Sequence, residues 1–493
     1  MPDATTSGAA VARSAAGDPS ARRWLWTALG LGAALRLLAA LLSAPTPGDD
    51  VGRLAAACRW AQDPRWLGLS GLWPPVHTYL LGSLIRLGGD PLAAARVVGW
   101  VSTTAALPLF FLAVRELYGD ARRAAIATLL LALYYVHISM AGTAYAEAPY
   151  TLALFTSLLF VARSSRRTAH ARDREALLAG CAMAVALLLR HEAKLVWLVV
   201  LLWMVREAGR GAALRFAIPS VITLVLQVVD PAGRGHGFLF DVRAVTMMKL
   251  AEVALHGSRL EALQRWIVMP AGSPSAIVMT LALAGLLMSR RTWRRDLWAW
   301  LFAVQSALFL ALTIYPGWQP YLRYLFLYFV CLLPHAALAL AAVARRRPAL
   351  AVALVLLAVV IQGVAWSRGR NEDRRFGWLP IYRAAPQQAV LDRWVRDQLG
   401  ARRVLALEGY PQMWDVYASV IKLEGGARLA QLRSVSYDQR LALAGGGRLD
   451  LAGFDVLLLD PSALRFRPAW QRLPPGWQVA YQDARLAIFR LER

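Results

Sequence analysis

The sequence lacks the motifs of the commonest nucleotide-driven and hydrolytic enzymes. It contains no Walker loop, no CxxC or HExxH pair and no GxSxG elbow, which argues against ATP-driven transport and the most frequent hydrolases. The two halves show no internal repeat, so a secondary transporter is less expected. Cysteine is also scarce, and two of the three, Cys181 and Cys331, fall within apolar segments while Cys58 lies outside them. We therefore expect no disulfide framework.

Carboxylates are few relative to cations, and apolar residues dominate the composition. Lys and Arg number 55 against 31 Asp and Glu, 58% of residues are hydrophobic, and the mean hydropathy is +0.43. About eleven apolar stretches approach the roughly 20 residues that a membrane-crossing helix needs. They lie near residues 24–44, 94–114, 122–141, 147–163, 175–189, 194–206, 213–229, 275–289, 297–315, 323–343 and 349–366. This pattern predicts an all-α polytopic membrane domain over 23–366.

The net charge of +24 is explained by topology rather than by nucleic acid. Arginines gather in alternate short loops, which by the positive-inside rule marks the cytoplasmic side. These clusters are Arg122–Arg123, residues 163–174, residues 206–215, residues 290–295 and Arg345–Arg347. We expect residues 1–22 to be a disordered cytoplasmic leader and the first helix to be retained. An odd number of spans then places the C-terminus outside a cytoplasmic membrane.

Three outward segments are longer than a turn. Residues 45–93 contain a short helical stretch, 51–60, and an apolar run too short to span, which we expect to lie in the interface plane. Residues 230–274 form a second long outer loop. Residues 367–493 change to a polar composition with short strand signals at 403–407 and 455–459, a helix over 387–399 and a terminal hairpin over 477–491. We expect this tail to be a small α/β domain outside the membrane.

Ionisable residues gather at the outer ends of the predicted spans. Because a charged group in or next to the membrane is energetically costly, each of them is a candidate for a functional role. Asp49 and Asp50 follow the first span, Glu147 opens the fourth, and two further groups mark later turns. These groups are Arg190, Glu192 and Lys194, and Arg323 with Tyr324. An acidic centre with several cations suits a phosphorylated substrate held beside a group that must lose a proton. Arg36 lies in mid-span, and we expect it to face the bundle interior and pair with a carboxylate.

These motifs together resemble the GT-C fold glycosyltransferases, in particular the protein-mannosyltransferase and aminoarabinose-transferase-like branch. The order of the motifs and their shared face carry the resemblance, which covers essentially the whole membrane part. The matching segments are Asp49–Asp50 with the helix to Ala61, Trp73-Pro74-Pro75 with His77, Ala95–Arg96, Leu117-Tyr118-Gly119, Glu147-Ala148-Pro149, Arg190-His191-Glu192 and Arg323–Tyr324 with Pro334. The second aspartate departs from the family's usual Asp-Glu pair, so either Asp49 or Asp50 is a candidate base.

The resemblance implies a polyprenyl-phosphate-linked sugar as donor and membrane lipids as surroundings. A first-loop aspartate would deprotonate a glycan, lipid or protein acceptor, which attacks the anomeric carbon with inversion, while cations hold the phosphate. The residues expected at the substrate are Glu147, Arg190, Glu192, Lys194, Arg323, Tyr324 and His77. No metal ligands are assigned, although a divalent cation is kept open as a cofactor.

Several residues also have plain structural explanations. The aspartate pair could cap the following helix, and Arg190 and Lys194 could extend to the membrane interface. At the level of the whole protein, the alternatives are a transporter or flippase, or a non-catalytic binder of lipid-linked intermediates.

Overall fold

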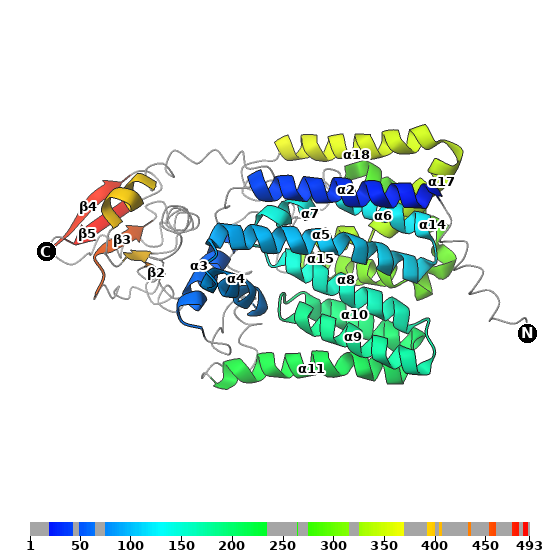
Figure 1. Ribbon diagram of the computed structural model, residues 1–493, viewed down its shortest axis with the longest axis horizontal. Coiled ribbons are helices and arrows are strands. Elements are labelled where there is room, and N and C mark those ends of the chain that lie inside the picture. Colours follow the sequence, from blue (N-terminus) through cyan, green and yellow to red (C-terminus); the bar gives the residue numbers. More distant parts are fainter. Residues whose placement is uncertain are drawn as a thin grey trace, which may run out of the picture.

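The computed structural model describes residues 19–42, 49–64, 74–233, 264, 275–314, 325–368, 392–399, 404–406, 432–434, 453–459, 476–482 and 487–491. Long helices form a bundle, and a small group of strands lies beyond one end of it (Figure 1). The helices α3 (Asp49–Gln62) and α4 (Val76–Arg86) lie at that same end. Arg323, Tyr324, Trp73 and most of the loop 230–274 fall outside the described residues.

A helix or a pair of helices stands at each of the eleven apolar segments of the sequence. They are α2 (Pro19–Leu42), α5 (Pro91–Tyr118), α6 (Ala121–Ala132) with α7 (Tyr135–Ser139), α8 (Glu147–Ser164), α9 (Ala169–Leu187), α10 (Ala193–Glu207), α11 (Arg210–Gly233), α14 (Ala276–Met288), α15 (Leu297–Ile314), α16 (Phe326–Val330) with α17 (Leu333–Arg346), and α18 (Pro348–Arg368). Two 3₁₀ helices, η1 (Met140–Gly142) and η3 (Arg290–Arg295), connect them. The helix α2 begins at Pro19, so the last four residues of the expected leader 1–22 belong to it.

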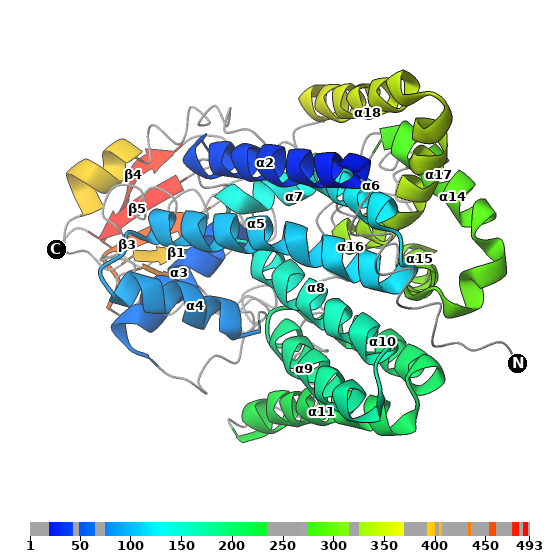
Figure 2. The same cartoon turned by 45° about the vertical axis from the view of Figure 1, so that its right-hand side comes forward.

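Among the described helices, three are long and apolar enough to cross a membrane. They are α2, α5 and the segment Phe326–Arg346, and the bent pair of α6 with residues 135–142 makes a fourth. The full number of eleven crossings stays a prediction. Figures 1 and 2 show α9, α10 and α11 side by side along one flank of the bundle, with α18 on the opposite flank.

Local sequence explains where the central helix α5 begins and ends. Asp90 caps its first turn by accepting the backbone N–H of Ala93 at 2.9 Å, and Pro91 occupies the first helical position, where a missing N–H costs nothing. The helix ends at Gly119, whose φ of +69° is the left-handed conformation that glycine adopts without strain. The first turns of α5, which carry Ala95 and Arg96, lie next to α3.

The helices α3 and α4 pack on each other at the end of the bundle nearest the strands. Trp60 lies against Tyr79 with ring centroids 5.5 Å apart, and a Cβ at Gly82 would come within 2.4 Å of the Trp60 ring. The backbone N–H of Val76 donates to the carbonyl of Leu188 at 3.2 Å, which joins the start of α4 to the turn after α9. These contacts hold α3 and α4 against the bundle.

The C-terminal strands form one five-stranded sheet in the order β2-β1-β3-β5-β4. The strands are β1 (Val404–Ala406), β2 (Leu432–Ser434), β3 (Val456–Leu459), β4 (Trp477–Gln482) and β5 (Ala487–Leu491). β1 pairs parallel with β2 and β3, and β5 pairs antiparallel with β3 and β4. Thus strands stand at the predicted sites 403–407 and 455–459, and the terminal hairpin is present. Within the expected helix 387–399, the structure describes helical residues 392–399.

Candidate functional site

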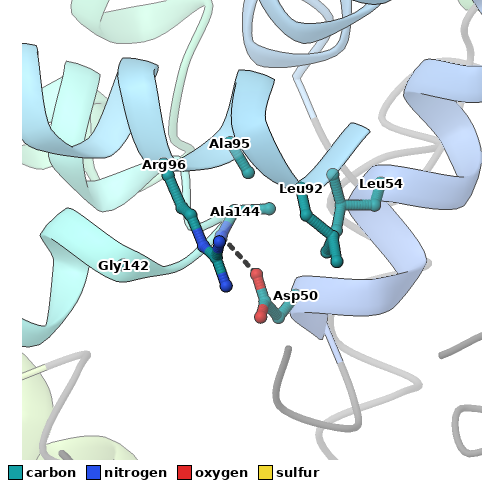
Figure 3. Close-up of a pocket in the computed structure, with 7 residues that line it drawn as sticks. All are labelled: Asp50, Leu54, Leu92, Ala95, Arg96, Gly142 and Ala144. Carbon is teal, nitrogen blue, oxygen red and sulfur yellow. Dashed lines mark hydrogen bonds between the residues drawn. The ribbon is translucent and has the colours of Figure 1, made fainter. Parts of the chain in front are cut away.

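Asp50 is buried in the first turn of α3, with 1% of its surface exposed. Its carboxylate accepts a hydrogen bond from the backbone N–H of Ala144, in the turn before α8. The two residues line a small cavity together with Leu54, Leu92, Ala95, Arg96 and Gly142. Figure 3 shows the Arg96 side chain descending from α5 with its guanidinium directed toward the Asp50 carboxylate. A buried carboxylate, a backbone donor and a cation therefore meet at one point.

The local sequence explains why Asp50 is turned inward. The residues Val51, Leu54, Ala55 and Cys58 are buried, so one apolar side of α3 rests on the bundle. The helix N-terminus also favours a carboxylate. Helix capping alone would use the N–H groups of α3, whereas this carboxylate reaches a turn 94 residues further along the chain. Asp49 is the first residue of α3, and its side chain lies outside the description.

Arg190, in the turn between α9 and α10, pairs with two carboxylates, one on α8 and one in its own turn. Its guanidinium forms an ion pair with buried Glu147, the first residue of α8. It also donates to both carboxylate oxygens of Glu192, from Nε at 3.0 Å and from a terminal nitrogen at 2.5 Å. Burial by itself raises the pKa of Glu192, but the charge and hydrogen bonds of Arg190 outweigh it and lower the pKa to about 2. Arg190 is thus engaged by protein carboxylates on both sides.

His77 lies buried in α4, close to two cations. Burial, and then the positive charges of Arg53 and Arg190, hold the pKa of His77 well below its ordinary value of 6.5. The imidazole is therefore neutral at pH 7. Neither ring nitrogen has a hydrogen-bond partner among the described residues. A neutral imidazole offers one hydrogen-bond donor and one acceptor. It therefore suits a hydroxyl group, which can both donate and accept, better than an anion, which can only accept.

The structure brings four of the nine predicted site residues into one group, while Asp50 lies in the cavity with Arg96, and Arg323, Tyr324 and the Asp49 side chain lie outside the described residues. His77, Glu147, Arg190 and Glu192 form one group through the contacts and charge interactions above, and Lys194 follows in the first turn of α10. Two cations were missed by the sequence analysis as site residues, Arg53 on α3 and Arg96 on α5. The available signal was weak: Arg96 is an ionisable residue near the outer end of an apolar helix, and Arg53 is one turn after Asp50 on the same helix.

A metal site has no support within the part of the chain that the structure describes. No group of three His, Cys, Asp or Glu side chains is arranged there to hold an ion. The described residues instead supply carboxylates paired with arginines and a backbone donor. Such a set can accept a proton and stabilise a phosphate.

One expectation from the sequence is wrong. Arg36 faces the bundle interior as expected, but it pairs with backbone carbonyls and with His137 rather than with a carboxylate. The physical reason is the interruption between α6 and α7, which ends the regular helical hydrogen bonds there: the carbonyl of Leu131 keeps only the N–H of Tyr134, three residues on, at 3.1 Å. A guanidinium satisfies these carbonyls with several donors at once.

Comparison with known proteins gives a family match over part of the chain and a shared fold. Residues 73–232 match the family model described as dolichyl-phosphate-mannose-protein mannosyltransferase. The crystal structure of ArnT from Cupriavidus metallidurans bound to undecaprenyl phosphate superposes with a TM-score of 0.57 at 16% identity, covering 94% of this chain and 97% of that one. The structure of the same protein in the apo state gives the same TM-score and identity, and the match covers 95% of this chain and 98% of that one. The archaeal oligosaccharyltransferase AglB from Archaeoglobus fulgidus gives 0.53 at 13% identity, over 90% and 70%. Among the curated proteins, no sequence matches.

These likenesses define the class of protein. The chain is an integral membrane protein with the fold of the GT-C glycosyltransferases. The family model over residues 73–232 agrees with the resemblance to the protein-mannosyltransferase family that the motifs suggested, and the solved structures share the fold.

Proposed function

We propose that the protein transfers a sugar from a polyprenyl-phosphate-linked donor to an acceptor on the outer face of the cytoplasmic membrane. The observation that carries this proposal is the environment of Asp50, a buried carboxylate that accepts a backbone N–H and faces Arg96 across a cavity. The family match and the undecaprenyl phosphate and dolichol-phosphate named for the structural neighbours support a lipid-phosphate carrier. The N-terminus would lie inside and residues 367–493 outside.

In the proposed reaction, Asp50 acts as general base. It takes the proton from an acceptor hydroxyl or amine, whose oxygen or nitrogen attacks the anomeric carbon of the donor sugar. The bond between that carbon and the phosphate oxygen breaks with inversion, and the lipid phosphate leaves with one more negative charge. Asp49 is the alternative base, one residue earlier on the same helix.

The cations of the site would stabilise the charge on the departing phosphate. Arg96 lines the same cavity as Asp50, and Arg53, Lys194 and Arg323 are the further candidates. Fixed cations in a site that excludes water stabilise developing charge without reorganising. Tyr324, the neighbour of Arg323, is proposed to contact the substrate at the same place.

We assign a different part to the group around Arg190. Because Glu147 and Glu192 already occupy its guanidinium, it would hold the two carboxylates in place for the sugar or acceptor. The neutral imidazole of His77 would contact sugar hydroxyls. These carboxylates and the imidazole would then set which substrate fits.

The experiment that tests this function compares envelope glycolipids and glycoproteins from strains with and without the gene by mass spectrometry. We expect one glycan class to lose a fixed sugar mass and the lipid-linked form of that sugar to accumulate. Purified protein should also bind undecaprenyl phosphate used as a probe. Identical glycan profiles together with no binding of the probe would contradict the proposal.

A further inference from the structure

The third membrane segment is broken just before the turn that reaches Asp50. The helix α6 ends at Ala132, and the segment formed by α7 and η1 continues at an angle of 62° to it. A bend of this kind interrupts the helical hydrogen-bond ladder inside the membrane, where freed carbonyls need other donors. The sequence around the break, Leu131 to Tyr135, offers no side-chain donor other than the tyrosines.

Arg36 from α2 supplies side-chain donors here, beside the backbone N–H of Tyr134, which donates to the carbonyl of Leu131 at 3.1 Å. Arg36 is fully buried and donates to the carbonyls of Ala132 at 3.1 Å and Leu131 at 3.2 Å. It also donates to its own helix at the carbonyl of Gly32, at 2.9 Å. The cation lies at the C-terminal, negative end of α6, where the helix dipole favours it. A Cβ at Gly32 would come within 2.6 Å of a Leu107 methyl group and 3.0 Å of the Ala132 Cβ, so α2 approaches this junction closely.

The same guanidinium holds the segment that follows the break. It lies 2.5 Å from Nδ1 of His137 on α7. Because arginine has no acceptor, Nδ1 accepts and the ring proton is on Nε2. The His137 ring stacks on Phe326 with an interplanar angle of 9° and a centroid distance of 5.4 Å. One arginine thus joins the end of α6, the start of the bent segment and, through His137, the helix α16.

From His137 the chain runs directly to the hydrogen bond of Asp50. The 3₁₀ helix η1 packs on the backbone of α5, where a Cβ at Gly99 would meet the carbonyl oxygens of Met140 at 2.5 Å and Ala141 at 2.7 Å. Two residues after η1, the N–H of Ala144 is donated to Asp50. The position of this N–H therefore depends on the direction in which the bent segment leaves α6.

We propose that Arg36 is a positioning residue for Asp50. By fixing the bend between α6 and α7, it presents the Ala144 amide to the carboxylate and favours the charged form of Asp50. This inference deepens the proposed function, since it concerns the residue that we assign as its base. A hydrogen bond to the ionised form lowers the pKa of a carboxyl group, so loss of the bond raises it.

The test follows the protonation of Asp50 itself. Dicyclohexylcarbodiimide reacts with protonated carboxyl groups, and mass spectrometry of the labelled full-length protein in detergent gives the pH of half-maximal labelling at Asp50. In Arg36→Met this pH should rise by about one unit because the backbone donor no longer faces the carboxylate. An unchanged midpoint in Arg36→Met that elutes as a single folded species would overturn the proposal.

A matched control separates positioning from general stability. Arg123, at the opposite end of α6, is also buried, donates to the carbonyl of Pro334 at 2.8 Å and lies 3.5 Å from Nδ1 of His335. Arg123→Met should leave the Asp50 midpoint unchanged, and an equal shift in that variant would refute a specific role for Arg36.

Milder variants serve if Arg36→Met does not fold. Arg36→Lys keeps the charge but has a compact ammonium in place of the fork, so it should shift the midpoint less than methionine. His137→Leu should produce a shift in the same direction, and no shift in both milder variants would overturn the proposal. Transfer is not part of this readout, so the link between Arg36 and Asp50 can hold even if Asp50 proves not to be the base.

Discussion

Arg190 and Glu147 form a buried ion pair that joins the turn before α10 to the first residue of α8. Their side chains are 9% and 3% exposed, so neither charge is compensated by bulk water. Removing one member of such a pair leaves an uncompensated buried charge, which costs more than the pair itself contributes. The pair therefore fixes the relative position of two helices at the site, whatever its net effect on stability.

The ion pair gives a first prediction about stability. Arg190→Met should destabilise the protein by about 3–5 kcal/mol, because Glu147 remains buried without its cation. The double variant Arg190→Met/Glu147→Gln should recover part of this loss. Thermal unfolding in detergent measures both. As a control, Arg215→Met removes the half-exposed pair with Asp173, which is 2.7 Å long, and should cost at most about 1 kcal/mol. Equal losses in the single and double variants would contradict the prediction.

A second prediction concerns pH and Glu192. Its pKa in the folded protein is lowered from 4.5 to about 2. A lowered folded-state pKa means that the ionised form stabilises the fold above the unfolded pKa, and that this contribution disappears as pH falls from 4.5 toward 2. The wild type should therefore unfold at a higher temperature than Glu192→Gln at pH 7, and the difference should shrink below pH 4.5. A difference that is constant or grows on acidification would disprove the assignment.

The third prediction tests Arg96 as a phosphate contact. Arg96→Ala should weaken binding of undecaprenyl phosphate by about 10- to 150-fold, the range expected for one charge-assisted contact. Arg96→Lys should recover only part, because the bidentate fork is lost. Arg115 lies on the same helix but near its other end, so Arg115→Ala should bind like wild type. Binding assays on purified protein that show no difference between the two alanine variants would exclude Arg96 from the phosphate site.

The fourth prediction concerns topology. After replacement of the three native cysteines, single cysteines at Ser70, Gly272 and Gly446 should react with an impermeant maleimide added to intact cells. A cysteine at Ser165, next to the basic turn after α8, should react only after lysis. This follows from the one-sided distribution of arginine. Labelling of Ser165 in intact cells with protection of Gly446 would place Asp50 in the cytoplasm and reverse the proposed orientation.

Much of the fold follows from apolar length in the sequence. The predicted segments 147–163 and 297–315 agree with α8 and α15 almost to the residue. The break after Ala132 was not predicted, because an uninterrupted apolar run carries no sign of a bend. For the same reason the partners of Arg36 were wrong, since the acceptors are backbone carbonyls that only the bend makes available.

The sequence singled out several residues of the candidate site, but it missed Arg53 and Arg96 and could not predict the contacts. Asp50, Glu147 and Arg190 are identified by residue type and by their place at the ends of apolar segments. The contact of Asp50 with Ala144 has no sequence signal, because every residue except proline carries a backbone N–H. Likewise, Arg96 becomes a site residue only when α5 packs beside α3.

The most direct test of Asp50 as catalytic base is complementation of a strain lacking the gene with Asp50→Asn and with Asp49→Asn, followed by mass spectrometry of the envelope glycans. Loss of a general base reduces rates by about 10²- to 10⁴-fold. Asp50→Asn, expressed at the wild-type level in the membrane, should therefore fail to restore the glycan, whereas Asp49→Asn should restore it. Full restoration by Asp50→Asn would contradict the assignment.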